Sequence, residues 1–244
     1  MKRCVMICIL AFFVVWCLNT DVMASKHRHL QGNAKVKSNS DADFSIETYL
    51  DKYIESNGED KYSIDFEIHE DDESGSGGIS KIQIEPPKGQ KMDLKNGMRL
   101  ACFELESGLL SLKDFQDIYP EGKYKTTLYP KSKYGSRTFD ISHNFPPVPE
   151  ITYPENGAVD LPLSFTIEWE SNDYDDVYLA LKIGNDEDSL QLEPGISQDT
   201  TSFVIPDGLL KTNTQFEIEL TAEWYIDGVE YNTTRSIVFT TGSE

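Results

Sequence analysis

Apolar and polar residues alternate along much of this chain, which is the period of a β-strand with one buried face. Tyr62, Ile64, Phe66 and Ile68, for example, alternate with polar side chains. The segments that we predict to be strands are residues 62–68, 79–84, 98–105, 123–129, 137–142, 151–153, 163–169, 178–183 and 217–226. The chain is therefore predicted to be mainly β.

Two segments before residue 120 have the features of short helices instead. Between residues 44 and 58, apolar side chains recur at the spacing of one helical face, and an Asn-Gly pair supplies a stop. The second helix is predicted to follow Ser111, with Asp114 three residues later as in a capping box, and to end before Pro120.

Three prolines between residues 145 and 150 divide the chain. They hold the backbone near polyproline geometry and remove amide donors that a sheet would need. We therefore predict two β-rich domains, at residues 43–144 and 151–244, joined by a proline linker at residues 145–150. The two short helices belong to the first domain.

The second domain resembles the fibronectin type III family. It follows a proline-rich opening, carries Trp169 on its second predicted strand, and has Leu210 six residues before Phe216. The family has a tyrosine where Phe216 stands, so the hydroxyl that ties that corner to the backbone is missing. The resemblance covers residues 147–241 and implies a fibronectin type III or immunoglobulin-like β-sandwich.

A broader resemblance covers residues 62–170. In a group of exported bacterial proteins, a Leu-Asp-x-x-Phe-Pro-x-Gly-x-Tyr segment leads into a proline-rich linker and a tryptophan-bearing strand. The matching segment here is Lys-Asp-Phe-Gln-Asp-Ile-Tyr-Pro-Glu-Gly-Lys-Tyr, at residues 113–124. The group has no established activity, so this resemblance concerns the fold and the export of the protein and leaves its function open.

The amino end has the three parts of a secretory signal. Lys2 and Arg3 precede an apolar run, and Ala24 stands at the expected cleavage site. Residues 1–24 are predicted to be a cleaved signal peptide, and the polar residues 25–42 a flexible leader. We expect a protein that is secreted or held at the cell surface, with no membrane span after the signal is removed.

Cleavage would leave Cys102 as the one remaining cysteine of the four in the chain. An internal disulfide is then impossible, so this thiol is either buried or paired between chains. Its apolar neighbours favour burial.

Charge is the strongest feature of the composition, because 42 Asp and Glu face 22 Lys and Arg and give a net charge of −20. Such a surface repels nucleic acid and anionic lipid, and it suits cations or basic partners. An acidic, well-solvated surface that keeps an exported protein soluble is the alternative interpretation.

Asp173, Asp175 and Asp176 are the candidate metal ligands. They lie in a predicted loop, and calcium binds six to eight oxygen ligands of this kind. The alternative is ordinary acidic loop chemistry, since the next acidic loop, at residues 185–189, follows the opposite end of a predicted strand. Calcium is the one cofactor that the sequence suggests.

Tyr174, Tyr225 and Tyr231 are the candidate ligand-binding residues. We expect them to be exposed beside carboxylates, where tyrosines bind sugars or protein surfaces. Tyr225 and Tyr231 flank Asp227-Gly228, which has the sequence of a two-residue hairpin turn. Carboxylate pairs are too abundant in this chain to single out catalytic residues.

The leading functional hypothesis is a secreted, non-catalytic binding or adhesion-type protein that recognises a surface glycan or a partner protein. One alternative is a secreted carboxylate-based hydrolase or an accessory subunit of one. Another is a calcium-stabilised structural spacer.

Overall fold

The structure is a computed structural model that describes residues 44–70, 78–89, 91–100, 102–183, 196 and 199–243. The predicted signal peptide and leader lie outside these residues, as does the acidic loop at 185–189. The described part of the chain is mainly β, as predicted.

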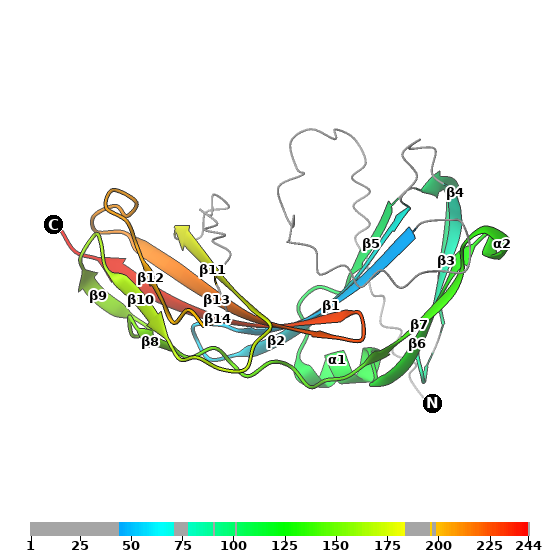
Figure 1. Ribbon diagram of the computed structural model, residues 1–244, viewed down its shortest axis with the longest axis horizontal. Helices are drawn as coiled ribbons and strands as arrows, with labels where there is room; N and C mark the ends of the chain where they lie inside the picture. The colour runs from blue at the N-terminus through cyan, green and yellow to red at the C-terminus, as the bar shows by residue number, and fades with distance from the viewer. Residues whose placement is uncertain are drawn as a thin grey trace, which may run out of the picture. The chain divides into compact units, whose positions relative to one another are not determined.

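The largest sheet has seven strands and contains segments from both halves of the chain (Figure 1). Its strands follow the order β11-β13-β14-β1-β2-β5, and β9 pairs with β14 outside this path. Their bounds are β1 (Phe44–Ile54), β2 (Asp60–Glu70), β5 (Cys102–Glu106), β9 (Ala158–Leu161), β11 (Asp176–Ile183), β13 (Gln215–Ile226) and β14 (Val229–Thr241).

Two smaller sheets accompany it. A four-stranded sheet, in the order β4-β3-β6-β7, consists of β3 (Ile79–Glu85), β4 (Met92–Leu100), β6 (Gly122–Tyr129) and β7 (Gly135–Ile141). A three-stranded sheet, in the order β12-β10-β8, consists of β8 (Ile151–Tyr153), β10 (Thr166–Trp169) and β12 (Ser202–Val204).

Two short helices complete the described elements, α1 (Leu112–Ile118) and α2 (Lys131–Tyr134). The predicted cap of α1 is confirmed, because the Ser111 hydroxyl accepts a hydrogen bond from the amide of Asp114 at 3.2 Å. Neither helix, nor any other in the part of the chain that is described, is long and apolar enough to cross a membrane.

The three-stranded sheet packs against β11, β13 and β14 over one hydrophobic core. Trp169 on β10 is only 4% exposed, and Leu210 and Phe216 are also buried in this core. Strands β11, β13 and β14 pair antiparallel, as do β8, β10 and β12, and two such layers over a shared core form a sandwich of the immunoglobulin and fibronectin type III kind. The predicted sandwich and its core residues are confirmed.

A second hydrophobic core lies between the four-stranded sheet and strands β1 and β2. It contains Phe66, Leu128 and Phe115, together with Val229 and Tyr231 from β14. Strands β13 and β14 are long, with 12 and 13 residues. The end of the hairpin near its turn contributes to the second core, and the other end contributes to the sandwich core. Figure 1 shows this hairpin in orange and red.

The tip of this hairpin is the predicted two-residue turn. Asp227 and Gly228 have φ angles of 52° and 82°, the left-handed conformations that a type I′ turn requires at both central positions. The turn therefore matches the twist of the two strands that it joins.

The helix predicted between residues 44 and 58 is wrong, because this segment forms strand β1. Leu50 and Ile54 on one side are buried in the strand, while Tyr49, Asp51 and Tyr53 on the other are half-buried. Tyr49 and Tyr53 lie half-buried on the polar side of the strand, and together with Leu50 and Ile54 they give the segment the spacing of a helical face. Long-range pairing decides the conformation, since β1 lies between β2 and β14.

Strand β1 joins the two halves of the chain. It pairs in parallel with β14 over six positions, from Tyr49 opposite Glu230 to Ile54 opposite Arg235. The proline segment contacts β14, because the hydroxyl of Thr233 on that strand donates to the carbonyl of Pro146 at 2.9 Å. Two cores linked by a shared sheet are therefore observed, and the division into independent domains stays a prediction.

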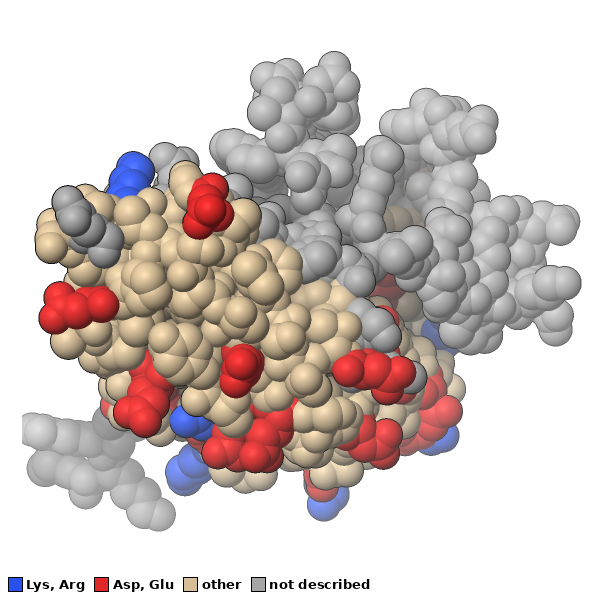
Figure 2. Space-filling model, turned by 60° about the vertical axis from the view of Figure 1, so that its left-hand side comes forward, with Lys and Arg blue, Asp and Glu red and all other residues tan. Residues whose placement is uncertain are grey.

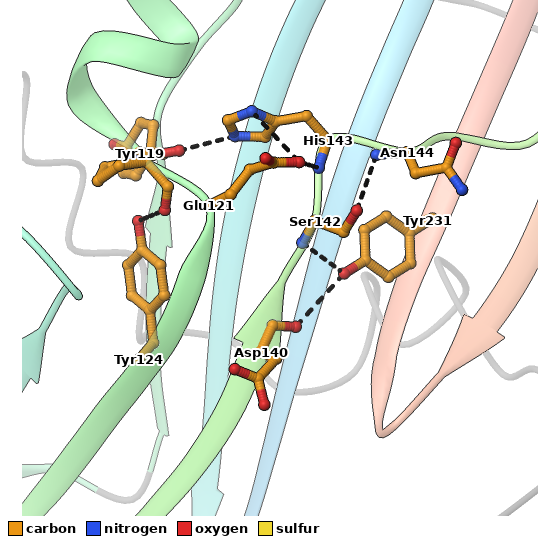
Figure 3. A network of polar contacts seen from close by, with 9 residues as sticks. Tyr119, Glu121, Tyr124, Asp140, Ser142, His143, Asn144 and Tyr231 are labelled. Atoms are coloured by element: carbon orange, nitrogen blue, oxygen red, sulfur yellow. Dashed lines mark hydrogen bonds and ion pairs between the residues drawn. The ribbon is translucent and has the colours of Figure 1, made fainter.

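A polar network holds the corner just before the proline segment (Figure 3). His143 contacts the carbonyl of Tyr119 through Nε2 at 2.8 Å, and its amide donates to Glu121 at 2.7 Å. The Tyr231 hydroxyl accepts from the amide of Ser142 at 3.1 Å. The end of β7 is thereby attached both to the α1 corner and to the hairpin strand β14.

Candidate binding face

One side of the seven-stranded sheet faces away from both cores, and we name it the acidic face. Because side chains alternate along a strand, every second residue contributes to it. Its polar and tyrosine side chains in the described part of the chain are Glu47, Tyr49, Asp51 and Tyr53 of β1, Lys61, Ser63, Asp65, Glu67 and His69 of β2, Glu104 and Glu106 of β5, Asp176 and Tyr178 of β11, Glu217, Glu219, Thr221, Glu223 and Tyr225 of β13, and Glu230, Asn232, Thr234 and Ser236 of β14.

Strand register places these side chains in rows across the sheet. One row runs through Tyr225, Glu230, Tyr49, Asp65 and Glu106, which lie opposite one another on β13, β14, β1, β2 and β5. Carboxylates in one row are close enough to repel one another. In the view of Figure 2, red Asp and Glu patches cover more surface than blue Lys and Arg patches.

The neighbouring row runs through Asp176, Glu223, Asn232, Asp51 and Ser63. Asp51 is its centre, because it accepts hydrogen bonds from the Asn232 amide and the Ser63 hydroxyl, each at 3.1 Å. The same Asn232 amide donates to Glu230 at 2.9 Å. These bonds connect the carboxylates of adjacent strands through a shared neutral donor.

Tyrosine hydroxyls also bond to the carboxylates. Tyr49 donates to Glu47 at 2.6 Å, and Tyr225 donates to Glu230 at 3.0 Å. Burial, followed by the nearby carboxylates, raises the pKa of both hydroxyls well above the ordinary tyrosine value. These tyrosines therefore stay protonated donors at any physiological pH.

Three carboxyl groups on the face are difficult to ionise. Burial raises the pKa of Asp51 to about 6, although its hydrogen bonds oppose the rise. Burial and then the charges of Glu67 and Glu104 raise the pKa of Asp65 to about 7. In Glu223, which is 2% exposed, burial and then the charge of Glu230 raise the pKa to about 7.

Two carboxylate oxygens on this face are buried without a hydrogen-bond partner, namely Oδ1 of Asp65 and Oε1 of Glu223. An unpaired buried oxygen of this kind is costly unless a proton or a cation satisfies it. Lys61 and His69 are basic residues on the face, but each already contacts a carboxylate, at 2.8 Å and 3.3 Å. Among the side chains that the structure describes, carboxylates therefore outnumber basic groups on this face.

A group of three carboxylates on β2 and β5 has the spacing of a cation site. One oxygen each of Asp65, Glu67 and Glu104 lies within 4.8 Å of the others. Hard cations such as calcium bind carboxylate oxygens, and a full site needs further oxygens from the protein or water. Among the described residues, this is the group of three that meets the spacing.

The three tyrosines that we predict to be exposed differ in how far the structure buries them. Tyr225 is 51% exposed, as predicted, but the predicted exposure of Tyr174 and Tyr231 is wrong. Tyr174 is buried in the sandwich core, and Tyr231 is buried in the second core with its hydroxyl bonded to the corner of Figure 3. A role of any of the three in ligand binding stays a prediction.

The predicted metal ligands lie at the start of β11. Asp175 accepts a hydrogen bond from the amide of Tyr225 at 2.7 Å, and the carbonyl of Asp173 accepts one from the Trp224 indole at 2.7 Å. Asp176 is paired with Glu223 in the sheet. These contacts attach the loop to β13, and calcium binding by the three aspartates stays a prediction.

The sequence pattern alone does not single out Asp51, Asp65, Glu223 or Glu230. A usable signal exists, because acids fill the polar positions of several alternating segments, including 65–67, 104–106 and 217–223. The strand order that brings these segments together is not visible in the pattern. The side chain of Cys102 lies outside the described part of the structure.

Comparisons with known proteins return no matching family model and no matching curated protein. Among solved structures, the FN1–FN3 domains of chicken CNTN1 match with a TM-score of 0.35 and 10% identity, over 81% of this chain and 68% of that one. A two-domain fibronectin type III segment of chicken tenascin matches with a TM-score of 0.27 and 12% identity, over 83% and 98%.

Likenesses of this size carry no argument about function. The class of the protein rests on its own strands and cores, which define a mainly β chain with a fibronectin type III-like sandwich at the carboxyl end.

Proposed function

We propose that the protein is a secreted, non-catalytic binding protein whose acidic face holds a basic segment of a partner protein. The observation that supports this is the continuity of the face, which has a carboxylate on every strand from β11 to β5. A basic partner would complement the excess of carboxylates among the described side chains of the face, and complementary charge also speeds association. Secretion follows from the predicted signal peptide.

A basic protein suits the face better than a neutral glycan. A neutral sugar gains nothing from net charge, and sugar sites use exposed aromatic rings. Here the hydroxyls of Tyr49 and Tyr225 are bonded to carboxylates, and Tyr49 is half-buried. Of the three tyrosines proposed from sequence, Tyr225 is the exposed one.

Binding of a cationic probe to matched variants tests the proposal. The mature chain would be immobilised and titrated with a synthetic peptide of alternating lysine and serine, at low and at physiological salt. One variant combines Glu67→Gln, Glu104→Gln and Glu106→Gln on the acidic face. Its control combines Glu150→Gln, Glu168→Gln and Glu170→Gln, exposed residues on or next to the three-stranded sheet.

We expect the acidic-face variant to bind about tenfold more weakly, or ~1.4 kcal/mol, and the control to bind like the wild type. Equal weakening of both variants would show that net charge alone attracts the peptide, which overturns the proposal. Tight, salt-independent binding to a neutral glycan array would assign the protein to glycan recognition instead.

The calcium-stabilised spacer is a second candidate, favoured by the spacing of Asp65, Glu67 and Glu104. Calcium that binds only the folded state stabilises it by RT ln(1 + [Ca]/Kd), so the unfolding temperature rises as calcium is added. Thermal unfolding with calcium and with a chelator would test it, and identical midpoints would remove it. The hydrolase alternative stays a prediction.

A further inference from the structure

The row that contains Glu223, Asn232 and Asp51 crosses the parallel junction of β1 and β14. This junction pairs residues 49–54 with residues 230–235, and it joins the two halves of the chain in one sheet. Parallel strands pair slightly less stably per residue than antiparallel strands. Side-chain contacts along the row therefore help to decide how firmly the junction is held.

Asn232 is the centre of the row, and its side-chain amide is shared between two carboxylates. It donates to Asp51 at 3.1 Å and to Glu230 at 2.9 Å, which uses both of its hydrogens. Because an amide carries no charge, Asn232 connects β14 to β1 without neutralising either carboxylate.

Glu223 lies on the other side of Asn232, in surroundings that oppose its ionisation. It is 2% exposed, and its Oε1 has no hydrogen-bond partner within the described part of the chain. The groups that face it are Asp175 just before β11, Asp176 and Tyr178 of β11, Tyr225 of β13, and Glu230 and Asn232 of β14. None of these groups is basic, and a buried charge is costly unless it is paired. The neutral form of Glu223 is therefore favoured.

Asp51 is half-buried on β1, and its two hydrogen-bond donors, Asn232 and Ser63, are both neutral. The titratable groups that face it are Tyr49 and Tyr53 of β1, Asp65 of β2, Glu106 of β5 and Glu230 of β14. Carboxyl groups thus face Asp51 from three neighbouring strands, and their charges oppose its ionisation.

The basic residues on this side of the sheet lie away from both carboxyl groups or have another partner. Lys182 of β11 stands opposite Glu217, at the far end of the strand from Asp176. Lys61 is diagonal to Asp51 in the register of β1 and β2, but it contacts Glu59 at 2.8 Å.

The direction of the pH dependence follows from this burial. Burial raises the pKa of Asp51 from 3.8 to about 6 and that of Glu223 from 4.5 to about 7. The neutral forms stabilise the closed junction fully below about pH 4, and this stabilisation is lost as pH rises to about 7. Ionisation then places negative charge on both sides of an amide that already bonds to Glu230.

We propose that Glu223, Asn232 and Asp51 form a pH-sensitive switch at the junction of β1 and β14. The row holds the junction closed while both carboxyl groups carry protons. When they ionise, mutual repulsion and lost solvation favour local opening of the paired residues 49–54 and 230–235. The switch is a property of the sheet itself, and it does not depend on the proposed partner.

Hydrogen exchange of the mature protein at pH 5 and pH 8, followed by NMR, tests the switch. Exchange rates corrected for the intrinsic pH dependence of each amide give the opening constant of each segment. The variants are Glu223→Gln and Asp51→Asn, which keep the shape of the side chain and remove the ionisable group. Their control is Glu168→Gln, an exposed residue of the three-stranded sheet, and the reference amides are those of β6 and β10.

We expect the opening constant of the junction to rise about tenfold or more from pH 5 to pH 8 in the wild type, and that of β6 and β10 to change less. Each carboxyl variant should reduce this rise about threefold, and the control should leave it unchanged. Asp65, which stays ionisable in both variants, supplies the remaining rise.

An equal rise in all strands would assign the effect to global unfolding and overturn the switch. A rise that both carboxyl variants retain in full would also overturn it. The carbon chemical shifts of the two carboxyl groups give a second measurement that needs no variant. Midpoints near pH 6 for Asp51 and pH 7 for Glu223 would support the switch, whereas midpoints at the ordinary values of 3.8 and 4.5 would contradict it.

Discussion

Replacing Asp65 with asparagine should stabilise the protein at alkaline pH and leave its stability nearly unchanged below about pH 4. Asp65 lies between β1 and β5, and burial together with Glu67, Glu104, Glu106 and Asp51 opposes its ionisation. The folded state therefore keeps a proton on Asp65 up to about pH 7, whereas the unfolded state releases it near the ordinary value of 3.8.

The sign of the pH dependence follows from these two values. Between about pH 4 and pH 7 the folded state binds more protons than the unfolded state, so the free energy of unfolding falls as pH rises through this window. A rise in pKa from 3.8 to about 7 corresponds to at most about 4 kcal/mol. Asp65 is partly exposed, so screening by solvent reduces the expected gain from Asp65→Asn to about 1–2 kcal/mol at pH 8.

Urea unfolding of the wild type, Asp65→Asn and Glu168→Gln at pH 5 and pH 8 would measure this gain. The difference between Asp65→Asn and the wild type should be largest at pH 8 and about two fifths of that size at pH 5, where the unfolded state has already released most of its proton. Glu168 is exposed on the other sheet and controls for the loss of one charge. A gain of equal size at both pH values, or a loss at pH 8, would refute the mutual repulsion of the acidic face.

Three further predictions concern the cores and the sheet. Tyr231→Phe removes the hydroxyl that accepts from the Ser142 amide, so the free energy of unfolding should fall by about 1–2 kcal/mol in chemical denaturation. Trp169→Ala opens a cavity in the sandwich core and should cost about 3–5 kcal/mol; a smaller loss than 1 kcal/mol would contradict its burial. A double-mutant cycle of Asp51→Ala and Asn232→Ala should give a coupling energy of about 0.5–1 kcal/mol, and strict additivity would deny the contact between β1 and β14.

The sandwich was predictable because its evidence is local. Alternation along residues 163–169 and 217–226 identifies strands, and a tryptophan on the second strand identifies the core. The turn at Asp227-Gly228 was equally readable, since both residues tolerate positive φ. In each case the residues that decide the structure are neighbours in the sequence.

The acidic face was not predictable in the same way. Its centre depends on parallel pairing between β1 and β14, which places Asp51 beside Asn232 although they are 181 residues apart. The segment that forms β1 has tyrosines at helical spacing, so its local pattern favours the wrong structure. The burial of Tyr231 was not predictable for a related reason, because the long hairpin carries this residue into the second core.

The most direct test of the account is a map of where a cationic ligand binds. Amide chemical shifts of the mature protein would be followed while the lysine-serine peptide is added at neutral pH. The account predicts shifts along β1, β2, β5, β13 and β14, centred on the row through Glu230, Tyr49 and Asp65. Shifts concentrated on β8, β10 and β12, or spread evenly over both sides of the protein, would contradict it.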